Sequence, residues 1–72
     1  MDTTTSLKEL SQKLVDEGKY NEAFPILKRA VQVSPEDGQL WSNLAWAALQ
    51  IEKFNEAVDA YKQTIRITPH SD

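Results

Sequence analysis

The stretch Lys19-Tyr20-Asn21-Glu22-Ala23 returns 34 residues later as Lys53-Phe54-Asn55-Glu56-Ala57, with one change, from tyrosine to phenylalanine. The same offset relates further identical residues, namely Leu10 and Leu44, Lys28 and Lys62, and Pro35 and Pro69. Other pairs keep their character, namely Phe24 and Val58, Val31 and Ile65, and Val33 and Ile67. A fixed period of about this length is typical of stacked helical repeats. The repeat therefore predicts a small binding scaffold and indicates no chemical reaction.

Length, charge and cysteine content exclude several classes of protein. The 72 residues suffice for one small domain, near the lower limit at which a single core offsets chain entropy. The absence of cysteine excludes disulfides, thiolate nucleophiles and cysteine-based zinc sites. A net charge of −3 disfavours nucleic acid as a partner, because phosphates require a basic face. The sequence contains neither a signal-peptide pattern nor an apolar run of about 20 residues, so we expect a cytoplasmic protein that does not bind membranes.

Apolar residues recur three or four positions apart in four segments, as on the buried face of an amphipathic helix. These residues are Leu7, Leu10, Leu14 and Val15; then Ala23, Phe24, Leu27, Ala30 and Val31; then Leu40, Trp41, Leu44, Ala45, Ala48 and Leu49; and finally Phe54, Ala57, Val58, Tyr61 and Ile65. Strand-like alternation is limited to Val31-Gln32-Val33, inside a helical segment. We therefore predict an all-α fold with a single domain over residues 1–72, with repeat one at about 4–37 and repeat two at about 38–72.

Residues that favour helix ends lie between these segments. Gly18 is expected to close the first helix, since glycine adopts the left-handed conformation of a C-cap without strain. Ser34-Pro35-Glu36-Asp37 predicts an N-cap serine followed by proline at the first position of the third helix. Asn21 and Asn55 are expected to begin the second and fourth helices. Pro25, about one turn into the second helix, predicts a small tilt and no break.

Small and large apolar residues alternate in a way that predicts two interlocked helical hairpins. Four alanines are expected to leave room for large neighbours, namely Ala23, Ala45, Ala48 and Ala57. The large residues expected to fill that room are Leu10, Leu14, Leu44, Phe54 and Tyr61. Neither hairpin buries its apolar face alone, so the core is expected to form where the two hairpins stack.

Taken together, these positions resemble the tetratricopeptide repeat, whose pattern is Trp-x2-Leu-Gly-x2-Tyr, then Ala-x3-Phe, then Pro. The second repeat has Trp41-x2-Leu44-Ala45-x2-Ala48, Ala57-x3-Tyr61 and Pro69, and the first has Leu7-x2-Leu10-Ser11-x2-Leu14, Ala23-x3-Leu27 and Pro35. Glu52 replaces the turn glycine of the family and Thr64 replaces its late alanine. The resemblance implies a short right-handed solenoid of four helices, and the chain stops where the family usually adds a capping helix.

The family resemblance also implies a function, because such repeats hold peptides or proteins and catalyse nothing. In the family, the first helix of each repeat lines a concave groove. The residues in that register are Thr5, Lys8, Glu9, Gln12, Val15 and Asp16 from the first helix, and Gln39, Ser42, Asn43, Trp46, Leu49 and Gln50 from the third. Two interpretations of Trp46 stay open: it packs partly on the first helix, or its exposed edge anchors a ligand.

One subset of the family holds the acidic C-terminal tails of heat-shock chaperones in a carboxylate clamp. Its first two repeats supply a lysine, an asparagine four residues later, and a second asparagine. The corresponding residues here are Lys8, Gln12 and Asn43, of which two match and the glutamine remains a hydrogen-bond donor. The basic pair of the clamp comes from a third repeat, which this sequence does not contain.

The last helix offers a different surface. Phe24, Lys28 and Val31 of repeat one are expected to pack against the third helix, but their counterparts have no fifth helix to cover them. These counterparts, with one neighbour, are Val58, Lys62, Ile65 and Ile67. An uncovered apolar stripe of this kind marks an association surface. It favours a homo-oligomer formed by end-to-end stacking or helix-pair exchange; alternatively the stripe is a tolerated exposed end, or the chain is a piece of a longer array.

Enzymatic activity finds no support in the sequence. The single histidine, His70, lies in the C-terminal tail without a matching partner. The carboxylates are scattered over solvated helix faces, and neither a glycine-rich phosphate loop nor a metal-ligand spacing is present. We therefore expect no catalysis, no metal and no cofactor, and a protein or peptide as the partner.

Overall fold

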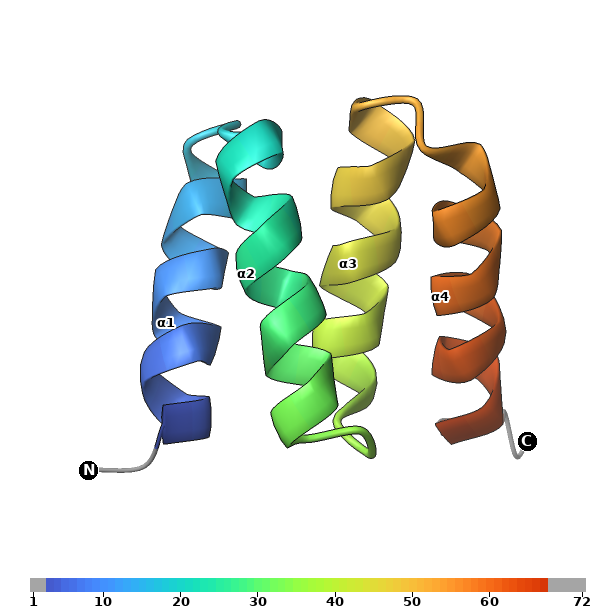
Figure 1. Ribbon diagram of the computed structural model, residues 1–72, viewed down its shortest axis with the longest axis horizontal. Coiled ribbons are helices and arrows are strands. Elements are labelled where there is room, and N and C mark those ends of the chain that lie inside the picture. Colours follow the sequence, from blue (N-terminus) through green and yellow to red (C-terminus); the bar gives the residue numbers. More distant parts are fainter. Residues whose placement is uncertain (1–2, 68–72) are drawn as a thin grey trace.

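The structure, a computed structural model, describes residues 3–67 of the chain, with side chains from residue 6 onward. It contains four helices: α1 (Thr3–Asp16), α2 (Tyr20–Val33), α3 (Gly38–Gln50) and α4 (Phe54–Ile67). The helices lie side by side in chain order, each antiparallel to the one before it (Figure 1). The predicted all-α architecture of two stacked helical hairpins is therefore confirmed. None of the helices between residues 3 and 67 is long and apolar enough to span a bilayer.

The turns inside the two hairpins are built alike. After α1, the Lys19 amide donates to the Leu14 carbonyl at 2.8 Å and the Gly18 amide to the Val15 carbonyl at 3.0 Å. After α3, the amides of Lys53 and Glu52 make the same two bonds, to Ala48 at 2.8 Å and to Leu49 at 3.1 Å. This pair of bonds defines a Schellman motif, which needs one left-handed residue. Gly18, at φ +76°, fills that position as predicted, and Glu52, at φ +64°, adopts it despite its side chain.

The connection between the hairpins differs from the prediction. Helix α3 begins at Gly38, and its N-cap is Asp37, whereas Ser34, Pro35 and Glu36 precede it in the connection. The Asp37 carboxylate accepts hydrogen bonds from the backbone amides of Gln39 and Leu40. A carboxylate next to two unpaired amides satisfies the helix start directly, which makes the predicted Ser34 cap wrong.

The first residues of α2 and α4 and the effect of Pro25 agree more closely with the predictions. Helices α2 and α4 begin one residue before Asn21 and Asn55, at Tyr20 and Phe54. Helix α2 runs without interruption from Tyr20 to Val33, with Pro25 inside it. The amide of Ala23, two residues earlier, already donates to the Lys19 carbonyl at 2.9 Å, so Pro25 lies beyond the unpaired first amides. The proline therefore removes one intrahelical hydrogen bond, to the Asn21 carbonyl, and the helix continues past this loss.

The core lies between the helices and consists mainly of alanine and leucine. Its members are Ala23, Phe24, Leu27, Ala30, Val31, Leu40, Leu44, Ala45, Ala47, Ala48, Ala57 and Ala60. The four alanines predicted to lie in tight contacts are all buried there. Ser11 is also fully buried, and its hydroxyl donates to the Lys8 carbonyl at 3.0 Å, so a polar group inside the core keeps a partner.

Several of the predicted large core residues are not in the core. Leu44 is 5% exposed, but its repeat counterpart Leu10 is 47% exposed, and Phe54 and Tyr61 are also exposed. Leu14 is half-buried against the core. The reason is position in the stack, because α1 and α4 are the outermost helices and each keeps one face that no other described helix covers (Figure 1). The repeat pattern predicts equal burial for equivalent residues, which holds only inside an array.

Candidate functional site

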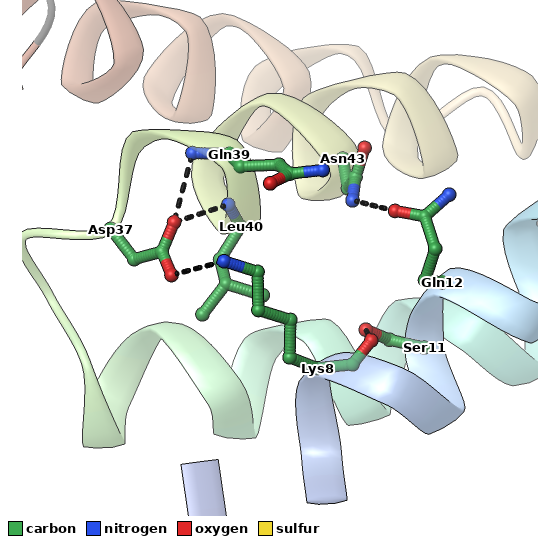
Figure 2. A network of polar contacts seen from close by, with 7 residues as sticks. All are labelled: Lys8, Ser11, Gln12, Asp37, Gln39, Leu40 and Asn43. Carbon is green, nitrogen blue, oxygen red and sulfur yellow. Dashed lines mark hydrogen bonds and ion pairs between the residues drawn. The ribbon is translucent and has the colours of Figure 1, made fainter. Parts of the chain in front are cut away.

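A polar network joins α1 to the start of α3. The Lys8 ammonium lies 2.8 Å from Oδ2 of Asp37, while Oδ1 of the same carboxylate accepts from the Gln39 and Leu40 amides at 3.1 and 3.3 Å (Figure 2). One turn further along both helices, Nδ2 of Asn43 donates to Oε1 of Gln12 at 3.0 Å. Three of the residues predicted for the groove, Lys8, Gln12 and Asn43, are therefore brought together, since each takes part in a contact that bridges the two helices.

Asp37 takes part in this network as a charged carboxylate. Partial burial raises the pKa of its carboxyl, but the hydrogen bond from Lys8, the backbone amides of Leu40 and Gln39 and the positive charge of Lys8 together outweigh burial. The pKa therefore lies below its usual value of 3.8, and Asp37 is ionised at neutral pH. The carboxylate both caps α3 and neutralises Lys8.

A solvent-open hollow of about 760 Å³ lies along this network. It is lined by Lys8, Glu9, Gln12, Lys13, Asp16, Glu17, Asp37 and Gln39. Four of these residues are carboxylates and two are lysines, so the lining carries an excess of negative charge. The Asp16 carboxylate also accepts the amide of Gln12 at 2.9 Å, which leaves few free donors for an anion.

Trp46 lies one turn beyond Asn43 on α3 and is 44% exposed. Its ring meets Tyr20, at the start of α2, edge to face, with centroids 6.5 Å apart and planes at 79°. Such a contact holds an aromatic ring in one orientation while leaving part of it accessible. Leu49, one turn further, is also exposed, whereas Val15 on α1 is half-buried and packs against the core. The second tryptophan, Trp41, is half-buried and donates its indole N–H to the Pro35 carbonyl at 2.8 Å.

Three contributors to this surface were not predicted from the sequence. The N-cap was predicted at Ser34, although Asp37, an aspartate followed by glycine before an apolar helix, is itself an N-cap signal. No place on this surface was predicted for Tyr20, the aromatic partner of Trp46, or for Lys13, because neither lies in the groove register. The side chain of Thr5, which was predicted for the groove, lies outside the described part of the chain.

The outer face of α4 is a second candidate surface. Val58 and Ile65 are 51% and 68% exposed, whereas their counterparts on α2, Phe24 and Val31, are 7% and 5% exposed. Lys62 is exposed as well, and Ile67 is only partly exposed. The four residues predicted for self-association thus differ in accessibility, with Ile65 the most open.

Lys28 was expected to pack against the third helix, and it lines a small hollow together with Trp41 and Leu44 of α3. Its ammonium also reaches Glu56 of α4 at 3.0 Å and lies 5.4 Å from the centre of the Phe24 ring. The long side chain covers the aromatic ring and keeps its charge in solvent.

No group of three histidine, cysteine, aspartate or glutamate residues within the described residues is arranged to hold a metal ion. His70, considered above as a catalytic candidate, lies outside the described residues, as does Pro69.

Comparison with known proteins agrees with this architecture. The model of the tetratricopeptide repeat family matches residues 14–72. The Hsp70-Hsp90 organising protein of Plasmodium falciparum is 39% identical over 61 residues, which is 85% of this chain and 24% of that protein. Intraflagellar transport protein 70A of Xenopus tropicalis is 39% identical over 57 residues, covering 79% of this chain and 9% of that protein.

A TPR repeat-containing protein of Methanocaldococcus jannaschii is 31% identical over 55 residues, covering 76% of this chain and 10% of that protein. The chain thus spans about a quarter or less of the length of the curated relatives it matches. The family match covers most of the chain and includes the end of α1 and the whole of α2, α3 and α4. The chain belongs to the tetratricopeptide repeat family.

Proposed function

We propose that this chain binds a peptide segment of another protein on the surface formed by α1 and α3. The observation that carries the proposal is the combination of an exposed, oriented Trp46 with a hollow and a polar network between the same two helices. Partly exposed aromatic residues held by their neighbours are frequent anchors in interfaces. Lys8, Gln12 and Asn43 would fix the direction of the peptide, while Trp46, Leu49 and Val15 would contact its apolar side chains. The role is one of binding, and we assign no catalytic step to it.

The charge of the hollow favours a neutral or basic peptide. Lys8 is already neutralised by Asp37 at 2.8 Å, and Gln12 already donates to Asp16. A peptide carboxylate would have to displace Asp37 and would meet the negative charges of Glu9 and Glu17 nearby. The relative from Plasmodium falciparum is named as an organiser of Hsp70 and Hsp90, but an acidic chaperone tail suits this hollow poorly.

Selection from a random peptide display library tests this proposal. We expect the selected peptides to be enriched in lysine or arginine together with an apolar anchor. Their affinity should fall about tenfold or more for Trp46→Ala, in line with the loss of an aromatic anchor. Phe54→Ala is the matched control, because Phe54 is an exposed aromatic on α4, away from α1 and α3, and this variant should bind as the parent protein does.

Circular dichroism should show equal helicity for both variants. Peptides that bind Trp46→Ala as tightly as the parent, or a library that yields only acidic sequences, would contradict the proposal.

A second candidate function is self-association through the outer face of α4. The observation in its favour is the exposure of Val58 and Ile65 at positions whose counterparts in repeat one are buried. Sedimentation equilibrium over a wide concentration range tests it. We expect association in the parent protein and a shift towards monomer in Ile65→Glu, which places a charge at the most exposed apolar residue of this face.

A further inference from the structure

The junction between the two hairpins is a closed contact between repeat one and repeat two. Across that junction, Lys28 of α2 forms its ion pair with Glu56 of α4 at 3.0 Å. Beside the pair, Val31 of α2 and Leu44 of α3 are each 5% exposed. All four residues line one small hollow of about 210 Å³ between the three helices, so they belong to one contact.

Each half of this contact has counterparts, 34 residues away in the sequence, at one end of the molecule. The α2 half, Lys28 and Val31, reappears on the outer face of α4 as Lys62 and Ile65. Its partners Leu44 and Glu56 reappear as Leu10 on α1 and Glu22 on α2, at the other end of the stack.

The counterpart residues at both ends are exposed to solvent. Ile65 is 68% exposed and Leu10 is 47% exposed. Lys62 and Glu22 are exposed, and neither has an ion-pair partner within residues 3–67. The molecule therefore has at one end an apolar face with a free lysine and at the other an apolar face with a free glutamate.

We propose that a second copy of this chain covers the α4 face, and that the copies stack head to tail. The exposed stripe of α4 packs on α1 of the next copy, Ile65 reaches Leu10, and Lys62 pairs with Glu22 of the next copy. The proposal rests on the self-association proposed above and adds which surface meets which. Its support is the internal junction, which has the same residue types at the same spacing and already forms a closed contact.

Head-to-tail stacking makes a heterologous contact, which leaves one uncovered α4 face and one uncovered α1 face at the two ends of every open assembly. The average molar mass therefore continues to rise with concentration beyond that of a dimer. A symmetric pairing of two α4 faces would instead stop at the dimer, and Glu22 would be far from its interface.

Charge reversal at the two ends tests the pairing. Alone, Lys62→Glu and Glu22→Lys each place like charges at every junction, so we expect each to weaken association about fivefold in physiological salt. In an equimolar mixture of the two variants, each copy meets the other kind with opposite charges at both ends, so association should return towards that of the parent. Glu52→Lys is the control, since it reverses an exposed charge in the turn between α3 and α4, and a Cβ at its counterpart Gly18 meets no atom within 4 Å; it should associate as the parent does.

Sedimentation equilibrium gives the readout, and circular dichroism checks that these exposed substitutions leave the fold intact. Recovery in the mixture, with growth beyond the dimer, supports the proposal. A parent protein that stays monomeric at millimolar concentration would overturn both self-association and stacking. Association that stops at the dimer, responds to Ile65→Glu and ignores Glu22→Lys would retain self-association through α4 and overturn the head-to-tail arrangement.

Discussion

Asp37 serves two purposes with one carboxylate, since one oxygen caps α3 and the other binds Lys8 of α1. We expect Asp37→Ala to lower the free energy of unfolding by about 1–2 kcal/mol, because both the cap and the ion pair are lost. Urea denaturation measures this change. Glu36→Ala is the neighbouring control. The Glu36 side chain is 75% exposed and its ion pair with Arg66 is long, at 3.4 Å, so the free energy of unfolding should fall by less than about 0.5 kcal/mol. Equal effects of the two substitutions would contradict the role of Asp37.

The lowered pKa of Asp37 predicts a pH dependence of this contribution. A carboxyl whose pKa is lower in the folded state stabilises the fold fully above its usual pKa of 3.8 and loses that effect as the pH falls through the folded value. The difference in stability between the parent and Asp37→Asn should therefore be largest near neutral pH and shrink below about pH 4. A difference that stays constant between about pH 7 and about pH 3 would show that the charge of Asp37 contributes nothing.

Gly18 and Glu52 occupy equivalent left-handed positions, at φ +76° and +64°, with opposite consequences for substitution. A Cβ added at Gly18 meets no atom within 4 Å, so the cost of Gly18→Ala is backbone strain alone, about 1 kcal/mol. Glu52→Gly should relieve the same strain and raise the free energy of unfolding by about 0.5–1 kcal/mol. Thermal unfolding of the two variants should move the midpoint in opposite directions. A lower midpoint for Glu52→Gly would contradict the interpretation of this turn.

At the scale of whole helices, position in the stack decides what a repeated residue contributes. Leu44 is enclosed by its neighbours, whereas Leu10, at the same place in repeat one, is 47% exposed on α1. We expect Leu44→Ala to cost about 2–4 kcal/mol and Leu10→Ala less than about 1 kcal/mol. Denaturant midpoints at low protein concentration, where no partner covers Leu10, provide the comparison. Similar losses at both positions would mean that α1 is covered as completely as α3.

The sequence predicts the helices well because their apolar period, the glycine turn and the 34-residue offset are local properties. It predicts the boundaries less well: Ser34 and Asp37 are both good caps, and only the neighbouring amides and Lys8 favour Asp37. Burial at Leu10, Phe54 and Tyr61 was overestimated for a different reason, because a repeat pattern does not show which copies lie at the ends.

The candidate surface was predictable in outline and not in detail. Register alone places Lys8, Gln12 and Asn43 on facing helices, and the structure shows them bridged. Glu9 and Asp16 of the hollow belong to the register, whereas Glu17 and Asp37 come from the turn and the connection. The Tyr20–Trp46 contact depends on a side chain of α2, which register does not include. Contacts of this kind arise only from tertiary packing.

At the scale of the whole molecule, we propose two different surfaces for two kinds of partner. The surface of α1 and α3 receives a peptide, while the two ends of the stack receive copies of the same chain. Trp46 lies on the first surface, and Ile65 and Leu10 lie on the second. Because these surfaces are separate, Ile65→Glu should retain the peptide affinity of the parent, and Trp46→Ala should retain its assembly state. Titrating each variant with a selected peptide, and sedimenting each alone, checks this independence; loss of both properties in one variant would contradict it.

The most direct test of peptide binding on α1 and α3 is a nitrogen-15 NMR titration of the chain with a selected peptide, because its two tryptophans report separately. We expect the indole N–H signal of Trp46 to shift, together with the side-chain amide signals of Gln12 and Asn43. The indole signal of Trp41, bonded to Pro35 at 2.8 Å, should stay in place. Shifts confined to Trp41 or to residues of α4, with the Trp46 signal unmoved, would contradict it.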